Sequence, residues 1–316
     1  MTEATGAEAA RVFTPSPGNP GPHPRPRRPS LALPRGATDA HCHVFGPADV
    51  FPYPPDRAFT PVDAPRDEVT GLQRFLGFQR AVFVQSAGHG TDHRPLLDAL
   101  AADRANRRGV AILRPGIGTA EILRLDAAGV CGARLHFVTH LGPGPEPEQA
   151  LRMLGQVADL GWHAEIHVRA RGIVEHAALI AAIPAPVVID HMARVDLAEG
   201  LDGPSVRALT SLLERGDVWV KLSGVDRLSL VGPPYPDAVA LAALLVERFP
   251  ERVVWGTDYP HVNITGTAPD DGILVDLIEQ MAPTATLRER LLVTNPAELF
   301  GFGPATDPSA KGSAHG

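Results

Sequence analysis

Two histidines two residues apart carry the most direct chemical signal in the chain. His41 and His43 follow Asp39 in the sequence DAHCH. Because alternate side chains of a strand point to the same face, we expect all three on one face. Imidazoles at this spacing can share a metal ion, and His167 and Asp258 would complete a four-ligand set typical of catalytic zinc. Such a metal lowers the pKa of its bound water and polarises a carbonyl group.

Ionisable side chains also stand at the ends of other apolar runs. They are Arg134 and His136, Glu165 and His167, Asp190 and His191, Lys221, and Asp258 with His261. Burying so many polar groups is costly unless they bind a metal, pair with one another or contact a ligand. The alternative is a set of unconnected core histidines, which stays open for His136. The same alternative is favoured for His89, His93, His163 and His176.

Short apolar runs alternate with segments of helical periodicity. The predicted strands are Thr38–Val44, Ala81–Gln85, Gly109–Leu113, Gly132–Phe137, His163–Val168, Val187–Asp190, Val218–Ser223 and Val253–Gly256. The predicted helices between them include Leu96–Arg107, Pro147–Leu160, Val174–Ile183, Ser205–Arg215 and Pro236–Phe249. Eight such units favour a closed (β/α)₈ TIM barrel, whose strand ends share one mouth. An open doubly wound sheet is the alternative, but no glycine-rich phosphate loop follows the first strand.

The two ends of the chain differ in composition from its body. Residues 1–36 are rich in Pro, Gly, Ala and charged residues and predict a disordered or draped arm. Residues 303–316 predict a disordered tail in the same way. The body, residues 37–302, suits a single barrel, for which about 250 residues is typical. The proline-rich segment 45–67 is a candidate lid over the mouth.

Composition narrows the classes of partner. The formal charge of −7 argues against nucleic acid, so the arginines at 25, 27 and 28 are interpreted as part of a solvated arm. No apolar run is long enough to span a membrane and no signal peptide is seen, so a cytoplasmic location is expected. Cys42 and Cys131 lie in apolar runs and predict free thiols. A homo-oligomer is the expectation from base rates.

Six segments together resemble a known family. They are DAHCHVFGP at 39–47, FVQSAGHGTD at 83–92, VIDHMARVD at 188–196, WVKLSG at 219–224, WGTDYPH at 255–261 and LVTNP at 292–296. They resemble the amidohydrolase superfamily, and within it the branch of 2-pyrone-4,6-dicarboxylate lactonase and the sulfomuconolactone hydrolases. DxHxH alone would indicate only the superfamily. The resemblance spans Asp39 to Pro296 and implies an amidohydrolase-like (β/α)₈ barrel.

The resemblance also implies roles for site residues. It implies that Asp258 is the general base that activates water, with His41, His43 and His191 around the scissile carbonyl. His191 is the second predicted catalytic residue. The predicted substrate contacts are Arg134, Arg227, His140 and His261.

Two positions depart from the dicarboxylate lactonase, which is understood to work without metal. That enzyme has a tyrosine at the position of His167 and an arginine at that of His140, and both touch its dicarboxylate. A histidine at the end of the fifth strand is what zinc-dependent members of the superfamily use. We therefore expect one zinc ion held by His41, His43, His167 and Asp258, with a metal-free mechanism as the alternative.

The predicted function is hydrolysis of a small anionic lactone, of the sulfomuconolactone or pyrone dicarboxylate kind. Water loses a proton to Asp258, and the hydroxide attacks the carbonyl. A metal or His191 stabilises the oxyanion. A zinc-dependent decarboxylase of the same superfamily is the alternative, and its release of carbon dioxide would distinguish it. A non-catalytic binding module on a barrel is a third hypothesis.

Overall fold

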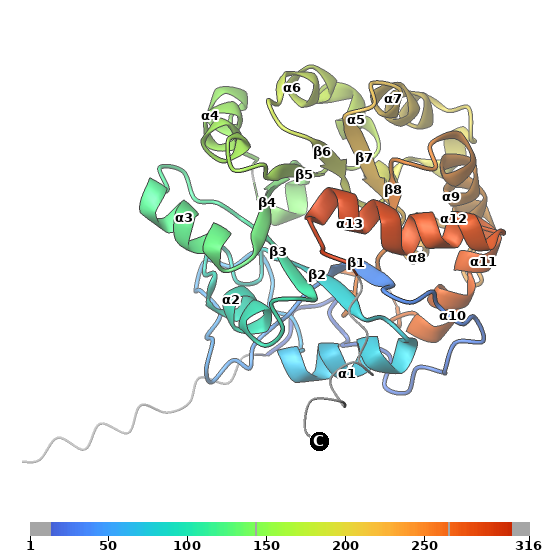
Figure 1. Cartoon of the computed structure of the whole chain (residues 1–316), viewed down its shortest axis with the longest axis horizontal. Coiled ribbons are helices and arrows are strands. Elements are labelled where there is room, and N and C mark those ends of the chain that lie inside the picture. Colours follow the sequence, from blue (N-terminus) through green and yellow to red (C-terminus); the bar gives the residue numbers. More distant parts are fainter. Residues whose placement is uncertain (1–13, 143, 265, 305–316) are drawn as a thin grey trace, which may run out of the picture.

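Eight parallel strands form one sheet that curls into a nearly closed barrel (Figure 1). The computed structural model describes residues 14–142, 144–264 and 266–304. The strands are β1 (Thr38–Cys42), β2 (Arg80–Val84), β3 (Arg107–Ala111), β4 (Val130–His136), β5 (His163–His167), β6 (Val187–Ile189), β7 (Val218–Lys221) and β8 (Val253–Val254). Each pairs in parallel with the next along the chain. This order confirms the barrel and excludes the open doubly wound sheet.

Backbone hydrogen bonds beyond the end of β8 bring the two edges of the sheet together. The N–H of Asp258 donates to the carbonyl of His41 at 2.8 Å, and the N–H of His43 donates to the carbonyl of Tyr259 at 2.8 Å. A Cβ on Gly256 would lie 2.5 Å from the backbone nitrogen of His41, so only glycine permits this approach. The closure therefore fixes the segment after β8 directly against β1.

Helices cover the outside of the barrel (Figure 1). They are α1 (Arg66–Leu76), α2 (Arg94–Ala101), α3 (Thr119–Ala127), α4 (Pro147–Ala158), α5 (Arg171–Glu175), α6 (Ala177–Ala182), α7 (Pro204–Leu213), α8 (Val225–Leu228), α9 (Pro236–Arg248), α10 (Asp271–Asp276), α11 (Ile278–Met281), α12 (Ala285–Glu289) and α13 (Asn295–Phe300). Shorter turns are η1 (Thr139–Leu141), η2 (Asp190–Arg194), η3 (Leu197–Glu199) and the π-type η4 (Arg290–Thr294). Helices α4, α7 and α9 each begin with proline. Proline lacks an N–H, but an N–H at this position has no acceptor within the helix, so no hydrogen bond is lost.

Two predicted helices end differently in the structure. The predicted helix Leu96–Arg107 is wrong at its C-terminus, because α2 ends at Ala101 and Arg107 begins β3. Asn106 explains the early end, since its side-chain amide and its backbone N–H both bond back to Asp103 and form a turn. The predicted helix Val174–Ile183 is divided between α5 and α6 by a break in the helical backbone.

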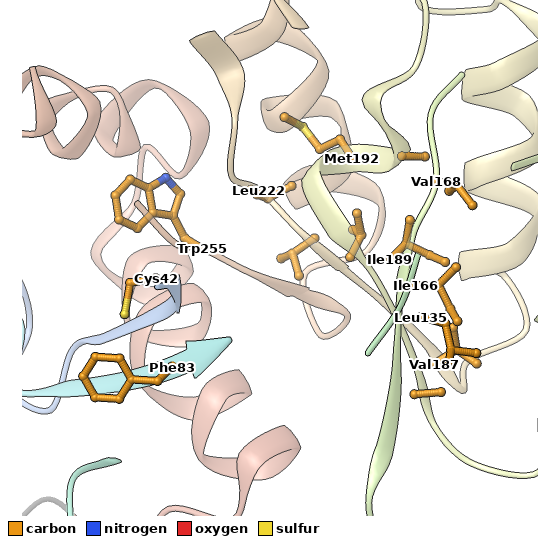
Figure 2. Close-up of a cluster of buried hydrophobic side chains, with 14 of the residues drawn as sticks. Cys42, Phe83, Leu135, Ile166, Val168, Val187, Ile189, Met192, Leu222 and Trp255 are labelled. Carbon is orange, nitrogen blue, oxygen red and sulfur yellow. The ribbon is translucent and has the colours of Figure 1, made fainter. Parts of the chain in front are cut away.

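Apolar residues lie on two sides of the strands. Between strands and helices, Phe83, Leu135, Ile166 and their neighbours form the main core (Figure 2). A second cluster, which includes Val82, Val188 and Val254, packs against Phe300 and Phe302 after the last strand. Neither described cysteine forms a disulfide, and Cys42 is buried while Cys131 is half-buried.

The described part of the N-terminal segment lies against the barrel. The backbone N–H of Arg27 donates to the Asp270 carboxylate at 3.1 Å, and the N–H of Ile264 donates to the carbonyl of Gly18 at 2.9 Å. Residues 1–13 of the predicted arm and 305–316 of the predicted tail lie outside the described residues. In the described part of the chain, no helix is long and apolar enough to cross a membrane.

Candidate active site

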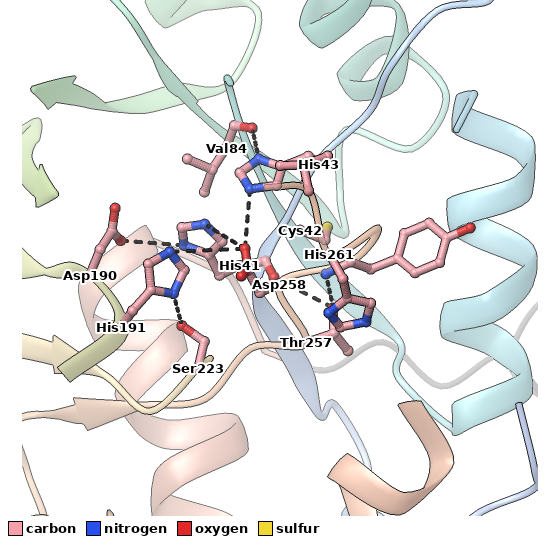
Figure 3. Close-up of polar contacts among 12 residues, drawn as sticks. His41, Cys42, His43, Val84, Asp190, His191, Ser223, Thr257, Asp258 and His261 are labelled. Atoms are coloured by element: carbon pink, nitrogen blue, oxygen red, sulfur yellow. Dashed lines mark hydrogen bonds and ion pairs between the residues drawn. The ribbon is translucent and has the colours of Figure 1, made fainter. Parts of the chain in front are cut away.

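Asp258 lies among three imidazoles at the C-terminal ends of the strands (Figure 3). Its Oδ1 lies 3.3 Å from Nε2 of His43, 3.7 Å from Nε2 of His41 and 3.9 Å from Nε2 of His191. All four side chains are buried. Segments that are far apart in the sequence, at β1, β6 and β8, thus bring one carboxylate and three imidazoles together.

A left-handed turn after β6 places His191. Four consecutive residues, His191 to Arg194, have φ between 43° and 56°. This conformation costs roughly 1–2 kcal/mol for each residue with a side chain. The N–H of Ala170 holds the turn by donating to the carbonyl of Ala193 at 2.9 Å. Such strain is characteristic of functional sites, and here it brings both His191 and Arg194 to the wall of one pocket.

Arg227 determines the charge state of Asp258. Burial alone would raise the pKa of this carboxyl, but the charge of the nearby Arg227 holds it well below its usual range. Nε of Arg227 lies 2.6 Å from Oδ2 of Asp258. Asp258 is therefore ionised, as a general base must be.

Hydrogen bonds at Nδ1 orient two of the imidazoles. Nδ1 of His43 lies 2.7 Å from the carbonyl oxygen of Val84, which can only accept, so Nδ1 carries a proton. In neutral His43 the lone pair of Nε2 then faces Asp258. Nδ1 of His191 lies 2.8 Å from Oγ of Ser223. Burial lowers the pKa of His191 to about 4, so this imidazole is neutral near pH 7.

A buried ion network lies beneath the imidazoles. Lys221 pairs with Glu165 at 2.5 Å, and Arg134 pairs with Asp190 at 2.7 Å. Nδ1 of His41 lies 3.1 Å from Nζ of Lys221 and 3.3 Å from Oδ1 of Asp190. A donor and an acceptor therefore compete for this nitrogen. The Asp190 carboxylate favours a proton on Nδ1 and leaves Nε2 free to bind a cation, whereas the ammonium favours the opposite tautomer.

Asp39 does not share a face with His41, so that prediction is wrong. The register of β1 shifts between Asp39 and Cys42. The Asp39 carboxylate accepts from the N–H and Oγ1 of Thr257 at 2.9 and 2.8 Å, and it contacts Gln73 on α1. Strict alternation along the strand fails at this bulge. Asp39 therefore ties β1 to the segment after β8 instead of facing the imidazoles.

His167 lies in the same pocket, beside a different partner. Its Nδ1 is 3.4 Å from Nδ1 of His136, and its buried Nε2 has no hydrogen-bond partner in the described chain. Burial, Arg134 and His191 lower the pKa of His167 well below its usual value. His167 is not among the ligand atoms that converge around Asp258.

The predicted substrate contacts lie in different surroundings. Arg134 and Arg227 line the pocket while paired with carboxylates, and His140 is exposed at its rim. His261 is buried with its Nε2 3.0 Å from Oδ1 of Asp271, and it is not among the residues that line the pocket. Asp271 more than offsets the effect of burial and raises the pKa of His261.

One group of side chains suits a metal ion. The ligand atoms of His41, His191 and Asp258 lie within 4.8 Å of one another. A second such group, His41 with Glu165 and Asp190, is already neutralised by the cations of the buried ion network. Nε2 of His41 is buried without a hydrogen-bond partner among the described residues. An orphaned imidazole nitrogen and a lone pair of His43 facing the same carboxylate fit a cation at Asp258.

The pocket above these groups has a volume of about 390 Å³ including its open mouth. It is lined by His43, Phe59, Ser86, Arg134, His140, Leu141, His167, His191, Arg194, Arg227, Asp258, Val262 and Asn263. Sequence reasoning missed Phe59, Ser86, Leu141, Arg194, Val262 and Asn263. Phe59 belongs to the segment considered as a lid, and Ser86 and Arg194 lie in the segments FVQSAGHGTD and VIDHMARVD, so all three carried a signal. Nothing in the sequence pattern singled out Asn263.

Comparisons with known proteins agree with this geometry. The family model described as Amidohydrolase matches residues 38–302. A 2-pyrone-4,6-dicarboxylate hydrolase of Comamonas testosteroni is 42% identical over 87% of this chain and 93% of its own. A 4-sulfomuconolactone hydrolase of Rhizobium radiobacter is 38% identical over 89% of this chain and 95% of its own.

A solved structure extends the agreement to the fold. The crystal structure of a putative 2-pyrone-4,6-dicarboxylic acid hydrolase from Pseudomonas putida superposes with a TM-score of 0.75 at 33% identity. The match covers 85% of this chain and 99% of the other. With the barrel, the imidazole–carboxylate cluster and the family match in agreement, the chain belongs to the amidohydrolase family.

Proposed function

We propose that this protein hydrolyses a small anionic lactone at Asp258. The observation that carries the proposal is the ionised, buried Asp258 carboxylate among three imidazoles in an arginine-lined pocket. The relatives named for hydrolysis of 2-pyrone-4,6-dicarboxylate and 4-sulfomuconolactone support this substrate class. Both names describe a ring ester that bears a carboxylate or a sulfonate.

The chemistry follows from the groups around the carboxylate. Arg227 holds Oδ2 of Asp258, so Oδ1 is the oxygen free to accept a proton from the attacking water. The hydroxyl of Ser223 can donate to Nδ1 of His191, which leaves the proton on Nε2. From there His191 donates to the carbonyl oxygen as negative charge develops on it. Asp258 then returns its proton to the leaving ring oxygen.

We propose one zinc ion for this site. His41, His43 and Asp258 are the proposed ligands, with His167 as the fourth. The ligand atoms of His167 are not in the group that converges around Asp258, so its imidazole would have to move towards the ion to bind it. The fit rests on the orphaned Nε2 atoms of His41 and His167 and on the Nδ1–H of His43, which directs the lone pair of its Nε2 towards Asp258. When bound, zinc would polarise the lactone carbonyl and lower the pKa of a water ligand. Binding through Nε2 requires His41 to donate from Nδ1 to Asp190.

Product analysis tests the activity. Purified protein is incubated separately with 2-pyrone-4,6-dicarboxylate and 4-sulfomuconolactone, and products are followed by mass spectrometry. We expect the gain of one water and one new carboxylate with at least one of these substrates. Release of carbon dioxide would support the decarboxylase hypothesis, which the comparisons do not favour. No turnover of any lactone in a wider panel would contradict the proposal.

A further inference from the structure

Arg194 differs from the other arginines of the pocket because no described acid pairs with it. Arg134 is bound to Asp190, and Arg227 is bound to Asp258. Among the described residues, Arg194 forms no ion pair within 4 Å, and its Nε is buried without a hydrogen-bond partner. Leaving a buried guanidinium N–H without an acceptor costs free energy, unless a ligand accepts its hydrogen bond.

Arg194 also lies where two cavities meet. With Arg227 and Asn263 it lines the inner pocket around Asp258, and the same three residues line a larger outer cavity of about 1,610 Å³ including its open mouth. The outer cavity is also lined by Arg169, which is exposed and likewise has no described ion-pair partner. Arg194 is therefore accessible both from the inner pocket around Asp258 and from the outer cavity.

The charges around Arg194 include carboxylates, but among the described residues none of them forms a direct ion pair with it. Burial and the nearby Arg227 and Arg169 lower its pKa to about 10, against the smaller opposing effects of Asp258 and Asp226. Asp226 and Asp270 also line the outer cavity, but neither forms an ion pair with Arg194. The backbone of Arg194 belongs to the left-handed turn, with φ 43°, so its position is set by a strained segment that also carries His191. Arg194 and Arg169 have no ion-pair partner among the described residues, and two such neighbouring cations favour binding of an anion.

We infer that Arg194, together with Arg169, forms an outer anion site that binds a carboxylate or sulfonate of the substrate while its lactone carbonyl lies at Asp258. The inference rests on the proposed function, because it names the substrate group that this part of the pocket recognises. The planar guanidinium suits both anions, because a carboxylate or a sulfonate can accept hydrogen bonds through two oxygens from two N–H groups of the arginine. Arg194 thereby determines specificity for a charged substituent distant from the reacting bond.

Steady-state kinetics and direct binding test this site together. The substrate is 2-pyrone-4,6-dicarboxylate, and the binding probe is isophthalate, a ring dicarboxylate with no hydrolysable bond. The variants are Arg194→Ala, Arg194→Lys and Arg169→Ala. Arg171→Ala is the matched control, because Arg171 is exposed at the start of α5 and lines neither cavity. Circular dichroism verifies that each variant is folded.

The two readouts give distinct expectations. Arg194→Ala should raise KM and the Kd for isophthalate by about tenfold or more, with kcat within about threefold of the parent. Arg194→Lys should show a smaller rise, and Arg171→Ala should show none. Two pyrones each carry only one of the two carboxylates. For the pyrone that lacks the carboxylate bound by Arg194, Arg194→Ala should not raise KM.

Particular outcomes would overturn the inference. One is an unchanged Kd and KM in Arg194→Ala, and another is an unmodified protein that does not bind isophthalate at millimolar concentration. If isophthalate binding depends on Arg194 but no lactone is hydrolysed, the anion site stands and the proposed activity fails. If lactones are hydrolysed with unchanged constants in Arg194→Ala, the activity stands and the anion site fails.

Discussion

The guanidinium of Arg227 lies 2.6 Å from the carboxylate of Asp258. Sequence reasoning assigned Arg227 to a substrate carboxylate, yet its Nε faces the protein's own acid. The pair gives Asp258 one occupied oxygen and one oxygen turned towards the imidazoles. It also holds the pKa of Asp258 below its usual range despite complete burial, which keeps the proposed base ionised.

Removing that charge should move the acid limb of the pH profile. In the parent, the depressed pKa of Asp258 keeps the base ionised to low pH, so turnover is lost only as pH falls through that low value. Arg227→Met removes the favourable charge and raises the pKa of Asp258. We expect the acid limb of kcat to move to higher pH, and Arg227→Lys to move it less. An unchanged limb in Arg227→Met would show that another group controls it.

Metal content should distinguish the roles of two neighbouring histidines. The proposal makes His167 a zinc ligand and His191 a residue that contacts the substrate carbonyl. We therefore expect near-stoichiometric zinc in the parent, reduced zinc in His167→Ala, and retained zinc with lost turnover in His191→Ala. Elemental analysis of the purified proteins measures this.

A matched control makes that comparison sharper. His93 bonds to the carbonyl of Ile112 and lies outside the pocket, so His93→Gln should keep its zinc. Reduced zinc in His191→Ala with full zinc in His167→Ala would show that His191 binds the zinc ion and that His167 does not. Full activity in metal-free parent would favour the alternative in which Lys221 holds His41 in the tautomer that cannot bind metal.

His261 should affect stability more than substrate binding. It is buried against Asp271, which raises the pKa of His261. Because a raised histidine pKa favours the protonated folded state, this contribution is full below the unfolded pKa of about 6.5 and is lost as pH rises through the folded value. His261→Gln should lower the free energy of unfolding by about 3 kcal/mol at pH 5.5 and by less at pH 9. Urea denaturation at both values measures the difference.

If His261→Gln lowers the free energy of unfolding equally at both pH values, the charge of His261 does not contribute to stability. A large rise in KM with unchanged stability would instead return His261 to the substrate site, where the sequence placed it.

The N-terminal segment should contribute to the pocket through Asn19. Its Oδ1 accepts from the N–H of Asn263 at 3.1 Å, and Asn263 lines both cavities. Asn19→Ala should raise KM severalfold and lower the free energy of unfolding by about 1–3 kcal/mol. Arg28→Ala is a matched control in the same segment, because Arg28 contacts Phe75 instead. Equal effects of both variants on KM would contradict a specific role for Asn19.

Strand ends were predictable because apolar runs and alternating polar residues mark them. His41, His43, His191 and Asp258 were all predicted from this pattern with the family resemblance, and the structure brings them together. The bulge at Asp39 was not predictable, since strict alternation contains no signal for a register shift.

The ion pairs within the barrel could not be predicted from the sequence either. The sequence placed Arg134, Glu165, Asp190 and Lys221 on strands but did not indicate which cation meets which acid. That choice depends on strand register and side-chain length across the barrel interior. The same limit hid the unpaired state of Arg194, because a missing partner is a property of three-dimensional packing.

The most direct test of the account is the rate of lactone hydrolysis by Asp258→Asn. The substitution keeps the shape of the side chain and removes its ability to accept a proton. The account predicts a fall in kcat of about a hundredfold to ten-thousandfold, with the fold intact by circular dichroism. Turnover within a few fold of the parent would contradict the central role of Asp258.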